Sequence, residues 1–347
     1  NNSNPLKIGI GSFAGHSLQG DDAIAIGRQA GLSDQGANSI SIGLKSGNLS
    51  QRSKTIALGV ESGFQDQGEN AISIGEKSGY DTQGTNGIAL GTNSGYAEQG
   101  ANAIAIGNMA GNSYQLEGNI ALGYQAGQKN VLGFYNTAVG YDSLTANNTG
   151  ERNTAFGYQA LATCTSGRYN TAIGYRSLTA LTTFQTNNSD ELGASNTAVG
   201  YESLLAVTTG FDNTGVGRHA LKSVQTGSKN VSIGRGTLPN LTGGQFNIAI
   251  GSDGVGSTIQ TGSDNIIIGS ADVNSSNTSS SNQIIIGNNA TGHGDNIAVI
   301  GNGLCIAWHP HDDDEVDLGS SSYRFNDLYM TGTANIGIVT ASTNFTV

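Results

Sequence analysis

The chain has 347 residues, of which 53 are Gly, about twice the usual share, and its net charge is −11 at pH 7. The Gly content disfavours an ordinary globular fold, while only 3 Pro and no three-residue Gly period exclude collagen, and the dispersed Ile, Val and Leu exclude simple disorder. The negative charge argues against nucleic acid as a partner, and every apolar run is far shorter than the roughly 18 residues that span a bilayer. A repeat protein without membrane insertion is the class that remains.

Short apolar runs end in a marker glycine that recurs at a regular spacing, which is the strongest pattern in the sequence. Counted along the chain, the spacing is 16 from Gly11 to Gly123, 17 to Gly174, 26 to Gly200, 17 to Gly251 and 18 to Gly287, with a last marker at Gly301. Such regularity indicates one unit stacked along an axis. The 18 markers therefore predict 18 coils of an all-β, parallel β-roll or β-solenoid with 16–18-residue coils.

Each coil of the first block, residues 1–127, contains a short apolar segment such as Ala103-Ile104-Ala105-Ile106 before Gly107. β-Branched residues that alternate with small ones predict a short strand, and the G-x-x-x-G pairs predict tight corners with positive φ. Both faces of this strand are apolar, and a 16-residue coil is too thin to bury both. We expect the Ile face to fill the coil and the Ala face to pack against other copies, most simply in an elongated homotrimer.

Asn recurs four or five residues before the marker glycine, which predicts an amide ladder along the axis. A row of ligand-binding amides is the alternative, and we assign these residues no binding role. They are Asn70, Asn86, Asn102, Asn119, Asn136, Asn153, Asn170, Asn196, Asn213, Asn230, Asn247 and Asn265.

The unit changes in the second block, residues 128–303, to one resembling N-T-A-V-G-Y, with a strand expected to be one residue shorter and a longer return segment. A Leu column at Leu144, Leu161, Leu178, Leu204, Leu221 and Leu238 predicts a filling for a wider coil. A Tyr column at Tyr141, Tyr158, Tyr175 and Tyr201 lines a corner, or alternatively contacts sugars.

The 26-residue spacing before Gly200 predicts an insertion near residues 181–195, on the outside of the solenoid. This segment carries polar groups suited to sugars and one aromatic ring. Its candidate receptor contacts are Phe184, Asn187, Asn188 and Asp190. The alternative is a tolerated surface loop without a role, because long insertions cost little stability.

Two resemblances follow from these motifs. The repeated A-I-A-I-G and N-T-A-V-G units resemble the head repeats of trimeric autotransporter adhesins of the YadA type, which implies a left-handed parallel β-roll in a tight trimer. The segment from Trp308 through Tyr329 resembles the part of phage tail fibres that precedes a C-terminal intramolecular chaperone. Residues 304–347 are therefore expected to form a separate tail-fibre-like segment, in which Trp308, Tyr323, Phe325 and Tyr329 are further candidate receptor contacts.

The sequence offers few residues for chemistry. Cys164 and Cys305 lie in different repeats and match neither a disulfide framework nor a metal pair, and no catalytic, phosphate-binding or calcium-repeat motif is present. His309 and His311 could offer imidazoles to a metal on a threefold axis, although they flank Pro310 in the tail-fibre-like motif. We expect no enzyme activity and no cofactor.

Three functional classes follow. The preferred one is the structural and host-attachment segment of a bacteriophage tail fibre in the virion, with a host cell-surface receptor, carbohydrate among the candidates, and other tail proteins as partners. The second is the head of an adhesin on a bacterial cell surface. The third is an ice-binding solenoid, which would carry a T-x-T array, whereas Thr137, Thr154, Thr171, Thr197 and Thr214 give only one Thr per coil.

Overall fold

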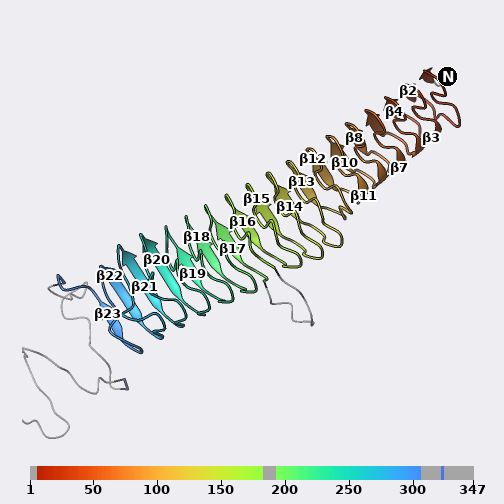
Figure 1. Cartoon of the computed structure of the whole chain (residues 1–347). Helices are drawn as coiled ribbons and strands as arrows, with labels where there is room; N and C mark the ends of the chain where they lie inside the picture. The colour runs from red at the N-terminus through yellow and green to blue at the C-terminus, as the bar shows by residue number, and fades with distance from the viewer. Residues whose placement is uncertain (1–5, 183–192, 306–321, 324–347) are drawn as a thin grey trace, which may run out of the picture. The chain divides into compact units, whose positions relative to one another are not determined.

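A computed structural model of the chain describes residues 6–182, 193–305 and 322–323, and divides the chain into a unit of residues 1–302 and a unit of residues 303–347. The first unit is a β-solenoid in which every coil contributes one strand to an 18-stranded parallel sheet (Figure 1). The predicted solenoid and its coil number are confirmed. Candidate receptor residues Phe184, Asn187, Asn188 and Asp190 lie outside the described residues, as do Trp308, His309, His311, Phe325 and Tyr329.

The strands of this first sheet pair in parallel with the strands of the neighbouring coils, in register, so that equivalent residues lie above one another, as Ile24 does beside Ile40. The strands are β1 (Ile8–Ile10), β2 (Ile24–Ile26), β4 (Ile40–Ile42), β6 (Ile56–Leu58), β8 (Ile72–Ile74), β10 (Ile88–Leu90), β12 (Ile104–Ile106), β13 (Ile120–Leu122), β14 (Thr137–Val139), β15 (Thr154–Phe156), β16 (Thr171–Ile173), β17 (Thr197–Val199), β18 (Thr214–Val216), β19 (Val231–Ile233), β20 (Ile248–Ser252), β21 (Ile266–Ser270), β22 (Ile284–Asn288) and β23 (Ala298–Ile300).

The polar return of the first block forms a second sheet, which the sequence analysis did not predict. Its five strands are β3 (Ser33–Gln35), β5 (Leu49–Gln51), β7 (Gln65–Gln67), β9 (Asp81–Gln83) and β11 (Ala97–Gln99). The expected shortening of the strand in the second block is wrong, because β12 and β14 both have three residues.

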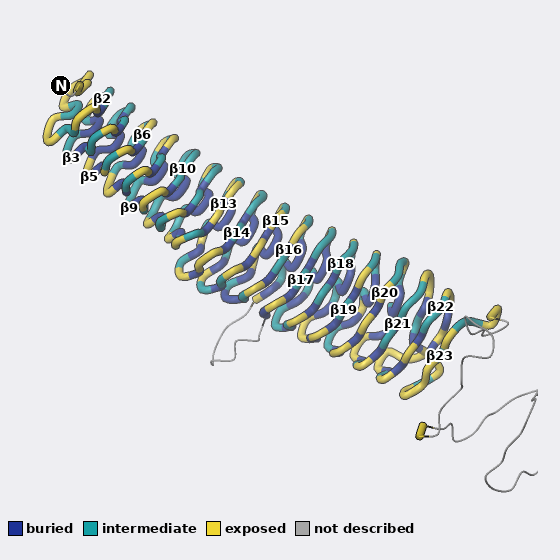
Figure 2. Tube along the Cα trace, turned by 180° about the vertical axis from the view of Figure 1, so that it is seen from behind, coloured by how far each residue is buried: buried dark blue, intermediate teal, exposed yellow. Residues whose placement is uncertain are grey.

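The predicted orientation of the first sheet is also wrong. From β2 to β22 the second residue of each strand of this sheet, such as Ala25 in β2 or Ala105 in β12, is buried, whereas the residues on either side of it are partly exposed. The small side chains therefore fill the coil and the large ones point outward, and the buried residues run along the whole solenoid (Figure 2). The reason is width, because the buried Gln side chains of the second sheet occupy the interior of a 16-residue coil and leave room for only methyl and hydroxymethyl groups opposite them.

The size of the buried residue follows the length of the coil. The 16-residue coils bury Ala or Ser in the middle of the strand, while the 17-residue coils add the fully buried Leu column that was predicted as a filling. Where the spacing reaches 18, the middle strand position holds Ile267 and Ile285, in register with Ala249 of the preceding coil. Longer return segments thus widen the interior, and the sequence fills it with larger side chains.

The marker glycines are required at the corners, as predicted. Gly157 has a φ of +136°, and a Cβ there would lie 2.4 Å from the carbonyl oxygen of Gly174 in the next coil. No L residue fits both the dihedral angle and the close approach of the neighbouring backbone.

Two ladders of buried amide side chains hydrogen-bond along the axis in the interior. In the first block Gln51 Nε2 donates to Gln67 Oε1 at 3.1 Å, and the row continues through Gln83 and Gln99 to Gln115. In the second block the buried Asn residues take over, as where Asn153 Nδ2 donates to Asn136 Oδ1 at 3.1 Å.

The predicted Asn ladder is therefore confirmed along the axis but consists of two different columns. Asn70, Asn86 and Asn102 lie exposed at corners with φ near +58°, and their amides hydrogen-bond to one another on the outside. From Asn119 to Asn265 the column lies inside the coil. The one-residue change in spacing to the marker glycine, from five to four, marks the change of side.

We predict that opposite volume changes at equivalent positions both destabilise the solenoid. Ala89→Ile overfills a 16-residue coil and should cost about 1–3 kcal/mol of unfolding free energy, and Ile267→Ala leaves a cavity in an 18-residue coil and should cost about 2–5 kcal/mol. Chemical denaturation followed by circular dichroism measures both, with the outward Ile88→Val as a control that changes volume on the other face. A stable Ala89→Ile protein would contradict the relation between coil length and interior volume.

Candidate functional site

The described residues with functional character lie at the corners that follow the marker glycines. Tyr124, Tyr141, Tyr158, Tyr175 and Tyr201 each follow such a glycine and are between 40% and 48% exposed. Successive rings are stacked with centroids 4.8 to 5.4 Å apart and interplanar angles of 7° to 20°. These five residues form what we call the tyrosine ladder.

Stacking decides what the tyrosine ladder can bind. Sugars pack against the face of an aromatic ring, but within the ladder each face is covered by the ring of the next coil. Only ring edges and hydroxyl groups remain exposed along the row. The alternative that the Tyr column contacts sugars is therefore restricted to ring edges, hydroxyl groups and the two ends of the ladder.

At the end of the tyrosine ladder the column changes from Tyr to Arg. The Arg218 guanidinium lies over the Tyr201 ring, 5.7 Å from its centroid, and the His219 ring is tilted by 59° against the same tyrosine. One coil further, Arg235 occupies the position after the marker glycine and pairs with Asp253 at 2.9 Å. The stack thus ends in two guanidinium groups.

An open hollow of about 360 Å³ lies beside these groups, and we call it the arginine hollow. Its lining consists of Arg218, His219, Arg235, Gly236, Pro239, Asp253 and Gly254. Three coils contribute, because each marker glycine from Gly217 to Gly251 is followed by one part of this lining.

Next to the arginine hollow, Glu202 joins three coils through ion pairs. Its carboxylate lies 2.8 Å from Lys222 Nζ, 3.4 Å from His219 Nε2 and 3.5 Å from Arg176, and its side chain is only 10% exposed. The hydrogen bond from Lys222 and the surrounding cations hold the pKa of Glu202 below its ordinary value. Burial and the neighbouring Lys222 and Arg218 lower the pKa of His219, although Glu202 opposes this effect. His219 is therefore held more toward its neutral form than a free histidine.

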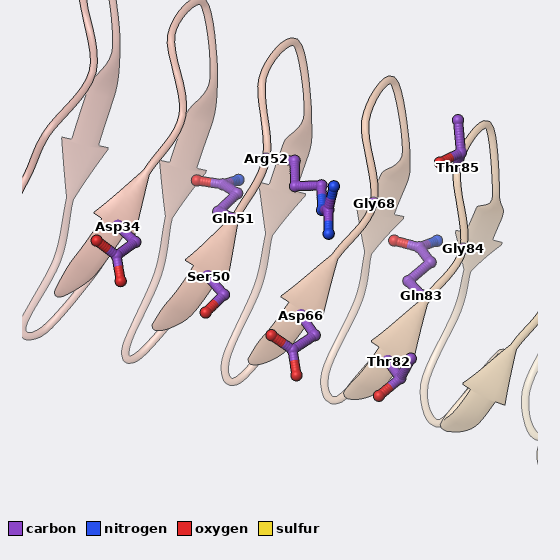
Figure 3. Close-up of a pocket in the computed structure, with 10 residues that line it drawn as sticks. All are labelled: Asp34, Ser50, Gln51, Arg52, Asp66, Gly68, Thr82, Gln83, Gly84 and Thr85. Atoms are coloured by element: carbon purple, nitrogen blue, oxygen red, sulfur yellow. The ribbon is translucent and has the colours of Figure 1, made fainter.

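A second hollow, of about 680 Å³, lies along the polar return strands of the first block. Figure 3 shows Asp34, Ser50, Asp66 and Thr82 in one row on successive strands, and Arg52 also lines the hollow. Acidic and hydroxyl side chains alternate in this row, which doubles the distance between like charges that would otherwise lie one coil spacing, roughly 4.8 Å, apart. The row offers hydrogen bonds to a polar ligand but carries no feature that selects one.

The described residues offer little for catalysis or metal binding. Within residues 6–182, 193–305 and 322–323, no group of three or more His, Cys, Asp or Glu residues is arranged to hold a metal ion. Burial raises the pKa of the Cys164 thiol to about 12, so this residue is protonated and inert. Tyr323, the one candidate receptor contact that the structure describes, is 84% exposed in the second unit.

No protein-family model matches the chain, and no curated protein is similar enough to count as a relative. In the described part of the chain, no helix has the length and apolar character needed to cross a membrane.

The Gln ladder, the Glu202 cluster and the arginine hollow were not predicted from the sequence. The Gln ladder was visible as a Gln at every sixteenth position from Gln35 to Gln115, a constancy that a solvent-exposed residue does not need. The arginine hollow was visible as charge, because residues 213–252 contain four of the 15 Lys and Arg residues and none of the 26 Asp and Glu residues.

We predict that Glu202→Gln lowers the melting temperature by a few degrees at pH 7 and that the difference from the wild-type protein disappears in acid. Because the folded pKa of Glu202 is depressed, its contribution is complete above the ordinary value of 4.5 and is lost as pH falls through the folded pKa. Thermal unfolding between pH 7 and pH 2 measures this effect. Glu76→Gln, at an exposed residue without an ion pair among the described residues, should change little at any pH. A difference that persists at pH 2 would contradict the assignment.

Proposed function

We propose that the chain is a shaft segment of a self-assembling, elongated attachment fibre without enzymatic activity, and specifically of a bacteriophage tail fibre. The observation that carries this proposal is the outward face of the first sheet, which we call the apolar face. It presents large apolar residues at nearly every coil, with exposed fractions from 36% to 55% at Leu58, Ile74, Ile120, Leu122, Phe156, Ile173, Ile233, Ile248, Ile250 and Ile284. Monomeric proteins seldom leave so extended an apolar surface in water.

A second copy of the same chain is the partner that fits this face best. The apolar residues recur once per coil along the solenoid, so a partner must offer apolar groups at the same spacing over the same length. The chain itself meets this condition, since its coils are in register throughout. Three copies with their apolar faces toward a common axis would remove the faces from water, as the resemblance to YadA-type head repeats implies.

The choice of a phage fibre rests on sequence outside the described residues. The W-x-P motif at Trp308 and the D-L-G-S-S segment from Asp317 resemble tail fibres, and they favour a virion protein with other tail proteins as partners. The head of a bacterial surface adhesin is the second candidate, favoured by the repeats alone. An ice-binding role fits less well, because the outward positions pair one Thr with Val, Phe or Ile, as in β15.

We predict that charges on the apolar face dissociate the assembly. The wild-type protein should have about three times the chain mass of 35.4 kDa in light scattering and should resist mild detergent. Leu122→Lys combined with Phe156→Lys, both outward in the first sheet, should yield a folded species of lower mass. Leu49→Lys, at a similarly exposed position of the second sheet, is the matched control. A wild-type monomer with normal stability would refute self-assembly, and a stable dimer would refute the trimer.

We also predict that the insertion near residues 181–195 can be removed without unfolding the solenoid. Thr182 N and Gly193 N donate to the carbonyl groups of Thr208 and Thr209, which are consecutive in the next coil, so both flanks lie beside the same part of that coil. Deleting residues 183–191 restores the 17-residue spacing and should keep the assembly and its melting temperature.

Attachment of the labelled protein to host cells then measures the contribution of Phe184, Asn187, Asn188 and Asp190. A loss of attachment would assign recognition to the insertion. Unchanged attachment would assign it elsewhere on the chain, where the tail-fibre-like segment with Trp308, Tyr323, Phe325 and Tyr329 is the next candidate, to be tested by aromatic-to-Ala substitution.

A further inference from the structure

The arginine hollow lies in a stretch of the solenoid, residues 213–252, that carries four basic residues and no acidic one. The whole chain carries a net charge of −11, yet no acidic residue occurs between Asp212 and Asp253, where Arg218, Lys222, Lys229 and Arg235 are found. A local cationic surface on an acidic protein attracts anions to that place and repels them elsewhere.

The neighbouring carboxylates pair with some of these cations and leave Arg218 and Lys229 without an ion pair among the residues that the structure describes. Lys222 and His219 pair with Glu202, and Arg235 pairs with Asp253. The Arg218 side chain is exposed and forms no ion pair or hydrogen bond with any residue that the structure describes. Among the described residues, its guanidinium interacts with the Tyr201 ring through a cation–π contact.

This stacking prepares Arg218 for a ligand. With one face of the guanidinium over an aromatic ring, its position is restricted while the N–H groups at its edge stay available. Such a planar donor set matches the paired oxygens of a carboxylate or a phosphate. Arg235, in the same column one coil away and 64% exposed, adds a second guanidinium that its pairing with Asp253 only partly occupies.

The size and openness of the arginine hollow indicate which class of molecule the bound anionic group belongs to. Its volume of about 360 Å³ suits a group of roughly monosaccharide size. Gly236 and Gly254 add no side chains to the lining, and Pro239 adds an apolar one. Because the hollow is open, a longer chain could continue past it in both directions, which an enclosed pocket would prevent.

We propose that the arginine hollow binds one anionic unit of a cell-surface polysaccharide, whose carboxylate or phosphate group is held by Arg218 and Arg235. The inference rests on the proposed attachment function and names the ligand class and its site. One unit in an open hollow binds weakly. A fibre presents several copies of the hollow, and a polysaccharide presents the unit repeatedly, so avidity supplies the strength.

The experiment compares matched polymers on the intact, assembled protein. Carboxymethyl dextran, dextran phosphate and neutral dextran of equal length are titrated by calorimetry at fixed ionic strength, with inorganic phosphate as a monovalent probe. We expect at least one anionic polymer to bind and neutral dextran not to bind, and the stronger of the two anionic polymers identifies carboxylate or phosphate as the group. Binding of neutral dextran with equal affinity, or no binding of either anionic polymer, would overturn the inference.

Two variants separate the arginine hollow from general charge attraction. Arg218→Gln should weaken binding about tenfold or more, because it removes a charge-assisted hydrogen-bonding group. Lys229→Gln removes the same charge from an exposed lysine that lies against Phe211 and Phe246, away from the hollow lining, and should change binding less than twofold. Equal losses in both variants would reduce the effect to net charge and refute the site. Melting temperature and mass of both variants check that fold and assembly are intact.

Cell attachment distinguishes this inference from the proposed function. If wild-type protein attaches to host cells and Arg218→Gln attaches equally well, the arginine hollow is not the recognition site and the attachment function stands. If the wild-type protein itself does not attach, the attachment function fails, whatever the polymers show.

Discussion

Every part of this solenoid depends on in-register parallel stacking at the strand spacing, which repeats each residue of one coil above the equivalent residue of the next. Each side chain therefore has the same or a similar side chain as its neighbour along the axis, at roughly 4.8 Å. Side chains that attract an identical side chain in the next coil stabilise such a column. Side chains that repel an identical neighbour are absent from the column or alternate with another residue type. Amides hydrogen-bond along the interior from Gln51 to Gln67, and tyrosine rings stack from Tyr124 to Tyr201. Charged columns change sign, as where Glu61 pairs with both Lys45 and Lys77.

Much of the fold was predictable because the period of the sequence can be read without knowledge of any contact between residues. The constant spacing of the marker glycines was sufficient for the number of coils, and the G-x-x-x-G pairs were sufficient for the corners, since only Gly tolerates φ near +130° against a neighbouring backbone. The Leu column at Leu161 and its equivalents indicated a wider coil correctly. These features depend on local geometry that every coil repeats.

The orientation of the first sheet was not predictable from the alternation of Ile and Ala alone. Both residues are apolar, so hydrophobicity does not decide which face lies inside, and the interior width does. That width depends on the second strand in the polar return, for example β7, whose residues Gln65, Asp66 and Gln67 lack the pattern of a strand. The middle residue, Asp66, has a φ of +48°, so the segment is bent where a regular strand would be extended. Once two strands face each other across a 16-residue coil and the second strand contributes a buried Gln, only Ala or Ser fits opposite it in the first sheet.

The same constraint separates the columns that we propose for assembly from those that we propose for recognition. A column that is uniform over many coils, such as the apolar face or the buried Asn row, presents one chemical group repeatedly, and its natural partner has the same repeat. Recognition of a different molecule requires a place where the columns change. The described residues contain such a place where Tyr201 is followed by Arg218 and Arg235, and where Glu202 joins three coils at the side. The change costs little in stability, because a guanidinium stacks on a tyrosine almost as the next tyrosine would. A solenoid can therefore exchange one side chain in an exposed column, keep its fold and gain a binding site. In the proposed fibre, binding specificity then lies in the irregular coils. Length and mechanical strength come from the regular coils.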